Sequence, residues 1–439
     1  MRELYFQTDF SAEEFGRRRA RVMEEIDGGL ALIAGAPEVA GFEPFRQNND
    51  FYYLCGVEVP HAYLLIDAER GASTLYVAEV DAKHEETDGP QLGPSDADFV
   101  RARAGVEATK SLSALVEGLK TQGERRIWLP HAAQEGRMVC QDTLRHRQKA
   151  AASDPMDGRV SDAARLIERV KQVAPGAEAR DLSPILQRMR LIKSPAEIAI
   201  MRKAGRLSAR AAEAAMNGTR AGIFEYELGA PAEAIFADAG AKGGSYRPII
   251  ASGKNIWMMH YWRNNSKLRD GEMVLFDYAP DLGNYTSDIG RMWPVIGKFS
   301  AEQREVYGFV VEYHKVLLSL IRAGRMAEDV LREGAERMRP GVARFKNDLL
   351  REGAAKLLES KRPLSHGVGM TVHEAGNWKE RPMEEGLVFA VDPEFVVPEL
   401  KMYVRCEDTV VVTAQGCENL THAAPVEIEQ IENTMRAGE

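Results

Sequence analysis

The sequence predicts an α/β (α+β) protein of two domains, and three observations support this prediction. Its 439 residues are more than one hydrophobic core usually holds. Strand-like and helix-like segments alternate up to residue 173, which favours helices packed on a mixed sheet. Beyond a turn at Pro175-Gly176, long helical segments flank strand-rich ones. We therefore expect an N-terminal domain over residues 1–178 and a C-terminal domain over residues 179–439.

The first domain opens with a predicted helix over residues 11–25, for which Ser11 is a suitable N-cap and Glu14 the third helical residue. The apolar run at 29–34 is typical of a buried strand. Further strands are predicted at 51–56, 62–67, 74–77 and 126–129, and further helices at 111–120 and 161–173. The domain contains neither a GxGxxG nor a GxxxxGK[ST] loop, so no motif in it predicts nucleotide binding.

The second domain opens with a strong helix start. Ser194 can cap the helix, Pro195 fits its first position, and Glu197 can close the capping box. The Ala-rich helix that follows should run to residue 216 or 217, where Gly218 can end it. A short helix is predicted from residue 180, longer ones at 225–239, 301–323 and 326–337, and strands from residue 246 to 293 and over 388–413.

The segment 271–293 reads as a β-hairpin with two acidic residues. Its turn residues are centred near Leu282-Gly283, so Asp277 and Asp288 should face each other across the ladder. Opposed Cβ atoms lie roughly 4.5–5.5 Å apart, and two carboxylates this close disfavour joint ionisation unless a cation lies between them. The alternative is an exposed hairpin with two solvated aspartates, and for these residues alone the two interpretations are evenly balanced.

Other candidate residues lie outside the hairpin. His260 sits in an apolar-aromatic run, His366 and His373 flank a glycine-containing segment, and Asp392 and Glu407 adjoin strand-like runs. Taken singly, each has an ordinary explanation: a hydrogen-bonded core histidine, turn chemistry before proline, or an ion pair within a strand. Taken together, they place several acidic groups beside apolar strands, where an unpaired charge is costly to bury.

Carboxylates with one histidine suit a hard or borderline divalent cation, with Mn²⁺ ahead of Zn²⁺ or Fe²⁺. Two such ions about 3.5–4 Å apart would suit hydrolysis by a bridging hydroxide. This predicts a metallohydrolase. The composition agrees with such an enzyme and not with a nucleic-acid-binding protein, because the net charge is −9 and no Lys/Arg run is present.

Cellular location can also be predicted. The four cysteines form no CxxC pair, which suits free thiols in a reducing compartment. The N-terminus lacks an apolar signal region, and no apolar span reaches about 18 residues, the length that suggests a membrane helix. We expect a cytoplasmic protein with no membrane partner.

These residues and their spacing resemble those of a known family. The chain is similar over nearly its full length to the Xaa-Pro aminopeptidase (aminopeptidase P) family of pita-bread metallopeptidases. The spacings of seventeen residues from His260 to Asp277 and seven from His366 to His373 match that family. The resemblance implies a creatinase-like α/β domain followed by a curved antiparallel sheet covered by helices. The segments that carry it are 46–53 (RQNNDFYY), 193–198 (KSPAEI), 260–261 (HY), 365–369 (SHGVG), 405–408 (RCED) and 418–421 (ENLT).

The resemblance also implies the ligands of two divalent ions, Mn²⁺ first, with Zn²⁺, Co²⁺ or Fe²⁺ as alternatives. Asp277 would hold one ion through both oxygens, Asp288 and Glu407 would bridge the two, and His366 would hold the other. Asp392 occupies the position of the fifth ligand. The family has Glu there, in a Glu-Pro-Gly context, so this side chain is shorter by one C–C bond, about 1.5 Å.

Further roles follow from the same resemblance. His260 and His373 would bind the substrate carbonyl and steady the tetrahedral intermediate, while Arg405 would orient the neighbouring carboxylates. A metal-bound hydroxide would attack the carbonyl before proline. Arg362 stands four residues before His366, where the family commonly has a histidine near the substrate proline. The substrates implied are short peptides with proline second, and a homodimer is expected.

Two other hypotheses remain. The first is a divergent pita-bread enzyme with one ion or an altered metal, acting on a non-peptide small molecule. Asp392, Glu394 and Arg362 motivate it, because an arginine can bind a carboxylate through two hydrogen bonds. The second is a catalytically silent binding protein, against which the retention of His260 and His373 argues.

Overall fold

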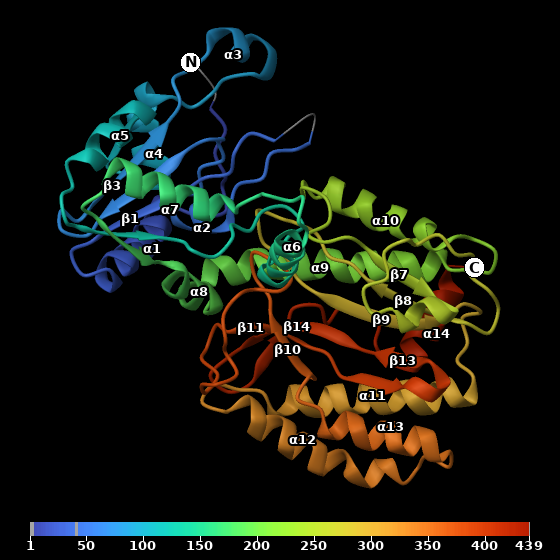
Figure 1. The fold of residues 1–439 in the computed structure, drawn as a ribbon. Helices are drawn as coiled ribbons and strands as arrows, with labels where there is room; N and C mark the ends of the chain where they lie inside the picture. The colour runs from blue at the N-terminus through green and yellow to red at the C-terminus, as the bar shows by residue number, and fades with distance from the viewer. Residues whose placement is uncertain (1–3, 40–42, 439) are drawn as a thin grey trace. The chain divides into compact units, whose positions relative to one another are not determined.

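The computed structural model describes residues 4–39 and 43–438, and the chain folds into two compact units, Met1–Met189 and Arg190–Glu439 (Figure 1). Both units combine helices with a sheet, which confirms the predicted two-domain α/β fold. The division at residues 178 and 179 stays a prediction. Strand β6 (Glu178–Asp181) begins there and pairs with a strand of the first unit. No helix in the described parts of the chain has the length and apolar character needed to cross a membrane.

The first unit is built on a six-stranded mixed sheet in the order β4-β3-β2-β1-β5-β6. Its apolar core includes Leu30, Leu32 and Ile127 from the sheet, with Leu115 and Val170 from helices packed on it. The strands are β1 (Leu30–Ala34), β2 (Tyr63–Asp67), β3 (Ala72–Val77), β4 (Ala108–Ser111), β5 (Arg126–Leu129) and β6. The helices are α1 (Ala12–Glu25), α2 (Asn49–Cys55), α3 (Ala82–Asp88), α4 (Ala97–Ala104), α5 (Leu112–Lys120), α6 (Gln141–Ser153) and α7 (Asp162–Val173), followed by α8 (Ser183–Leu191), whose last two residues belong to the second unit.

Helix α2 corrects one prediction, because residues 51–56 were expected to form a strand. Gly56 ends the helix with a φ of +66°, a left-handed conformation that glycine adopts at no steric cost. Every residue from Phe51 to Cys55 is buried, so the run has no exposed face. A short apolar run buried on all sides does not distinguish a helix from a strand by periodicity, which is why the prediction was wrong.

The second unit is built on an antiparallel sheet in the order β10-β11-β14-β9-β8-β7, with β15 beside β14 and a separate β12–β13 pair. The strands are β7 (Ile249–Ser252), β8 (Met273–Asp277), β9 (Ile289–Pro294), β10 (Leu364–Gly367), β11 (Val388–Val391), β12 (Glu394–Val397), β13 (Met402–Arg405), β14 (Glu407–Val412) and β15 (Cys417–Asn419). The helices are α9 (Pro195–Gly218), α10 (Glu225–Asp238), α11 (Ala301–Leu320), α12 (Ala327–Val342), α13 (Asp348–Glu359) and α14 (Ile428–Ala437).

Helices cover this sheet, as the family resemblance implied. Figure 1 shows the sheet between α9 on one side and α11, α12 and α13 on the other. Helix α9 contacts β9, and α11 contacts β11 and β13. Helix α9 starts with the predicted capping box, in which Ser194 Oγ accepts from the Glu197 amide and Glu197 Oε2 accepts from the Ser194 amide. The cap at Ser194 was thus predicted from the residues, whereas the sheet covered by helices was implied by the family resemblance.

The register of the β8–β9 hairpin differs from the prediction. Leu282 pairs with Tyr285 around Gly283 and Asn284, whose φ angles are +56° and +65°. Two successive residues with positive φ are typical of the tight turns that close β-hairpins. This turn is centred one residue later than predicted, so Asp277 pairs with Gly290 instead of Asp288.

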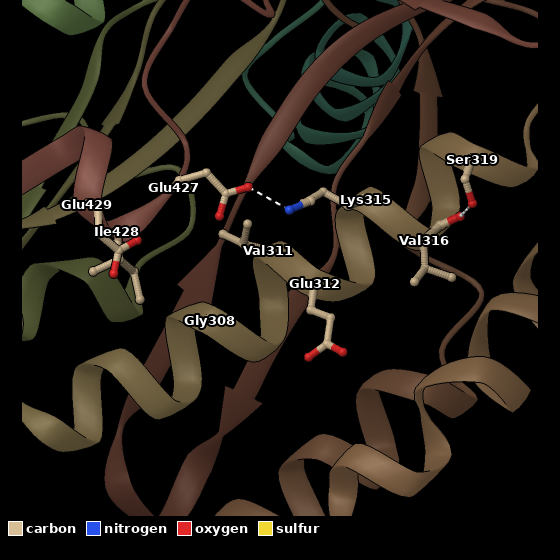
Figure 2. A pocket seen from close by; sticks show the side chains of 9 residues that line it. All are labelled: Gly308, Val311, Glu312, Lys315, Val316, Ser319, Glu427, Ile428 and Glu429. Atoms are coloured by element: carbon tan, nitrogen blue, oxygen red, sulfur yellow. Dashed lines mark hydrogen bonds and ion pairs between the residues drawn. The ribbon is translucent and has the colours of Figure 1, made fainter.

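A surface pocket of about 330 Å³ lies between α11 and the start of α14 (Figure 2). Lys315 Nζ and Glu427 Oε1 form an ion pair of 2.7 Å beside it. None of the residues that the sequence analysis singled out for chemistry lines this pocket. The chemistry therefore has to be sought at the sheet.

Candidate metal centre

Four acidic side chains meet where neighbouring strands of the second sheet begin or end. Asp277 ends β8, Asp288 immediately precedes β9, Glu407 begins β14, and Asp392 follows β11. These carboxylates are at most 5% exposed. Since β11, β14, β9 and β8 are successive neighbours, the sheet order brings the four residues together from segments far apart in the sequence.

Gly290 leaves room for this cluster. It pairs with Asp277 of β8 on one side and with Glu407 of β14 on the other. A Cβ atom added at Gly290 would lie 3.0 Å from Glu407 Cβ, 3.1 Å from Glu407 Oε2 and 3.2 Å from Arg405 Nε. The missing side chain therefore opens the space into which the carboxylates project.

Tyr246 joins the two aspartates of the hairpin. Its hydroxyl lies 2.7 Å from Asp277 Oδ1 and 2.8 Å from Asp288 Oδ1. Although Asp277 and Asp288 are not direct cross-strand partners, Asp288 is two residues from Gly290 and so points to the same face of the sheet. The expected proximity of the two carboxylates is thus present, but as a diagonal pair linked by a tyrosine.

Arg405 is the cation at the centre of the cluster. Its Nη1 donates to Asp277 Oδ2 at 2.9 Å, and its Nη2 also donates to Glu407 Oε2. Its Nε and Nη2 donate to the two oxygens of Asp392 at 3.0 and 2.8 Å. A planar guanidinium suits such a paired contact. Arg405 therefore contacts three of the four carboxylates, and its role in orienting them as metal ligands stays a prediction.

The three candidate histidines lie in one row. His366 Nε2 lies 3.5 Å from Asp288 Oδ2 and 3.9 Å from Glu407 Oε1. The His366 and His373 ring centroids are 4.0 Å apart, and those of His373 and His260 are 6.3 Å apart. The outermost ring, His260, is exposed. The row thus extends from the buried carboxylates to an exposed ring.

The residues fit a divalent cation. Asp288, His366 and Glu407 each offer a ligand atom, and these atoms lie within 4.8 Å of one another. Glu407 Oε1 is buried with no hydrogen-bond partner, which is costly for a carboxylate oxygen unless a cation binds it. The four carboxylates outnumber the single guanidinium among them. A donor set of carboxylate oxygens and one imidazole suits a divalent cation.

The pKa directions describe the same charge imbalance. Burial, and next the nearby Asp277, raise the pKa of Asp288 to about 7. Burial also raises the pKa of Glu407 well above its ordinary value, although Arg405 opposes this effect. Burial, with His373 beside it, lowers the pKa of His366 well below its ordinary value. A neutral imidazole is the form that binds a metal, whereas the carboxylates need a cation to stay ionised.

A buried ion-pair network supports the segment between His366 and His373. Arg190 Nη2 donates to Glu374 Oε1, and the Met370 amide donates to Glu374 Oε2 at 2.7 Å. Lys193 lies beside this carboxylate, and burial lowers its pKa to about 8. Because Glu374 directly follows His373, these contacts fix the backbone that carries both rings.

Sequence reasoning missed two contributors. Tyr246 is 31 and 42 residues away from the aspartates that its hydroxyl joins, and no local pattern marks it. Gly290 lies two residues after Asp288, but its importance depends on its pairing with Asp277 and Glu407, which was not predicted. Arg362, in contrast, was singled out and lies at the edge of the site, where its Nε is 3.1 Å from Glu394 Oε2.

Comparison with known proteins agrees with this geometry. Residues 199–414 match metallopeptidase family M24, and residues 15–128 match the aminopeptidase P N-terminal domain. The chain is 33% identical to an Escherichia coli protein named Xaa-Pro aminopeptidase, with 98% of this chain and 99% of that one covered. It is 31% identical to human Xaa-Pro aminopeptidase 3 over 88% of this chain and 76% of the relative.

Solved structures give the same result. A zinc-substituted E. coli aminopeptidase P in complex with product superposes with a TM-score of 0.81 at 30% identity, covering 98% of this chain and 100% of that one. A second E. coli aminopeptidase P structure, with the inhibitor Pro-Leu, gives a TM-score of 0.78 at 30% identity, covering 98% and 99%. The fold and the site define a metallopeptidase of the pita-bread class. This chain belongs to metallopeptidase family M24, in its aminopeptidase P branch.

Proposed function

We infer that this chain is a metal-dependent Xaa-Pro aminopeptidase, which releases the N-terminal residue from short peptides with proline in second position. The observation that carries this inference is the convergence of Asp277, Asp288, His366 and Glu407 on one buried volume, with Glu407 Oε1 left without a protein partner. The relatives over the full chain length bear the name of this activity.

We propose two divalent ions, with Mn²⁺ preferred and Zn²⁺, Co²⁺ or Fe²⁺ as alternatives. Asp277, Asp288 and Glu407 would hold them with His366, and Asp392 would be the fifth ligand. When bound, such ions polarise a carbonyl and lower the pKa of water. The absence of thiolate ligands from this set favours Mn²⁺ over softer metals.

The surrounding residues have separate roles in this proposal. Tyr246 and Arg405 orient the carboxylates through the hydrogen bonds described above. His373, stacked beside His366, and the exposed His260 would bind the substrate carbonyl and hold the proton that moves during hydrolysis. The buried network at Glu374 keeps the two rings of the 366–373 segment in place.

Purified protein supplied with Mn²⁺ should release alanine from the tripeptide Ala-Pro-Ala, and chelation should abolish this release. The variant His366→Ala should lose the activity and bound metal, whereas His84→Ala, on the exposed helix α3, serves as the matched control. An active protein after exhaustive chelation, or His366→Ala with full activity, would contradict the proposal.

One observation favours a second candidate. Arg405 occupies both oxygens of Asp392, the residue that is shorter than the family ligand. If this pairing persists with metal present, the chain would bind a single ion and could act on a small non-peptide substrate. Metal content measured by mass spectrometry separates the two candidates, since two ions per chain support the peptidase and one ion supports the alternative.

Assembly and location are also proposals. We propose a homodimer, as the family resemblance implies, and a cytoplasmic location, for which the cysteine usage argues. Sedimentation equilibrium would test the assembly, and cell fractionation would test the location.

A further inference from the structure

Arg362 lies at the edge of the proposed metal centre. It is two residues before β10, the strand that carries His366. Its side chain is 62% exposed, yet its Nε is fixed 3.1 Å from Glu394 Oε2. Its Nη2 lies 4.0 Å from the sulfur of Met259, the residue before His260. The guanidinium is therefore held near the outer end of the histidine row while much of its surface faces solvent.

The anchor of Arg362 is itself well fixed. The Glu394 side chain is only 8% exposed, and its Oε1 accepts a hydrogen bond of 2.6 Å from the Tyr403 hydroxyl. Glu394 pairs directly with Arg405 in the β12–β13 register. Cross-strand neighbours have Cβ atoms roughly 4.5–5.5 Å apart. The carboxylate that positions Arg362 thus stands beside the residue that organises the metal ligands.

The position of the cleaved bond gives this arrangement a direction. The proposed metal centre lies at the inner end of the site and Arg362 lies at its outer edge. An aminopeptidase places the first carbonyl of its substrate at the metal centre, so the residues after proline extend toward that outer edge. An arginine with free guanidinium donors binds a carboxylate through charge-assisted hydrogen bonds.

We propose that Arg362 is a specificity-determining residue that binds a carboxylate on the residue following proline, with Glu394 as its positioning residue. This inference rests on the proposed peptidase function and narrows the substrate class to short peptides with a carboxylate on the residue after proline. The carboxylate can be the C-terminal one or that of an acidic side chain, since both offer the same two oxygens.

Calorimetric titration of the Mn²⁺-loaded protein with product dipeptides tests the proposal without requiring turnover. The ligands are Pro-Ala with a free carboxylate, the same dipeptide as its C-terminal amide, and Pro-Glu amide. The free acid should bind about 10- to 100-fold more tightly than the amide, as expected for charge-assisted hydrogen bonds. Arg362→Gln should reduce this ratio to near one, and Arg362→Lys should retain part of it.

Arg344→Gln is the matched control, because Arg344 is 64% exposed and also paired with a glutamate, Glu312. It should keep the full ratio. Pro-Glu amide binding as tightly as the free acid would assign an acidic side chain, and binding as weakly as Pro-Ala amide would assign the C-terminus. Either result supports the proposal.

The proposal is overturned if none of the three ligands binds, if Pro-Ala and Pro-Glu amide both bind no more tightly than Pro-Ala amide, or if Arg362→Gln keeps the wild-type ratios. Glu394→Gln should weaken binding of the acid more than binding of the amide, because it releases the guanidinium of Arg362 from its fixed position. Failure of the proposed peptidase function can be distinguished from failure of this proposal. In that case Ala-Pro-Ala would not be cleaved, while Pro-Ala would still bind more tightly than Pro-Ala amide.

Discussion

Gly290 lies directly opposite Glu407, so that a strand position without a side chain faces a fully buried carboxylate. The same glycine pairs with Asp277 on its other side. Because a sheet places direct neighbours within a few ångströms, any side chain at Gly290 would compete with the carboxylates for one volume. The space for metal ions thus depends on what is missing at position 290.

The variant Gly290→Ala should therefore lose metal affinity and activity. Its Cβ would lie 3.0 Å from Glu407 Cβ, and overpacking of this kind costs about 1–3 kcal/mol of stability. Mn²⁺ titration and urea unfolding would measure both effects. Gly218→Ala is the control, since no atom lies within 4 Å of a Cβ there and the helix should be unaffected or slightly stabilised. Wild-type metal affinity in Gly290→Ala would refute this account.

Lengthening Asp392 should strengthen metal binding. The added methylene moves the carboxylate by about 1.5 Å, which lets it reach past the guanidinium of Arg405. We expect Asp392→Glu to raise the affinity for the more weakly bound ion and to raise kcat/KM for a proline tripeptide. Inductively coupled plasma mass spectrometry and peptide assays would measure these changes. The same substitution at exposed Asp270 should change neither quantity.

Removing the Tyr246 hydroxyl should weaken the centre without unfolding it. That hydroxyl contacts both Asp277 and Asp288. Loss of a group that hydrogen-bonds to metal ligands typically lowers metal affinity or activity by roughly 10- to 100-fold. Dialysis against buffered Mn²⁺ would give the affinity of Tyr246→Phe. Tyr226→Phe, at a 55% exposed position, is the control. An unchanged Mn²⁺ affinity in Tyr246→Phe would show that the tyrosine does not orient the ligands.

Stability of the chelated protein should depend on pH. The pKa of Asp288 is raised from 3.8 to about 7, so the folded state binds more protons than the unfolded state between these values. The free energy of unfolding should then be greatest below about pH 4 with respect to this group and should fall as the pH rises through 7. Urea unfolding with chelator at pH 5 and pH 8 measures this.

Two comparisons make the pH result specific. Added Mn²⁺ should reverse the loss at pH 8, because the cation favours the ionised carboxylates. Asp288→Asn should flatten the profile, since its side chain does not titrate. A chelated wild-type protein that gains stability between pH 5 and pH 8 would contradict the expected sign, unless other groups are shown to dominate by the Asp288→Asn profile.

The sequence predicted features that depend on local chemistry. Caps at Ser11 and Ser194 and the strand at 126–129 were correct, because they follow from a few neighbouring residues. The predicted hairpin turn was centred one residue too early, so the partner of Asp277 was wrong by two residues, because the turn is formed by Gly283 and Asn284 and the composition did not reveal the positive φ of Asn284. Helix α13 was missed although Asn347 caps it and its buried residues recur at helical spacing. Residues 51–56 were assigned to the wrong element because they are buried on all sides, so their pattern has no periodicity.

The candidate site could be predicted as a set but not as a geometry. The family resemblance, which the spacings of His260, Asp277, His366 and His373 support, implied one centre, and the structure brings these residues near Glu407. What the spacing could not supply was the pairing of strands, and hence the contribution of groups such as Tyr246. Contacts between residues tens of positions apart are set by the sheet order and not by local pattern.

The network at Glu374 affects how the second unit can be isolated. The match to family M24 begins at residue 199, yet Arg190 and Lys193 lie upstream of it and neutralise a carboxylate next to His373. A fragment that starts at residue 199 would leave Glu374 as a lone anion in an apolar interior, and the histidine segment would lose its support. The smallest self-sufficient hydrolase should therefore retain the chain from Arg190 onward.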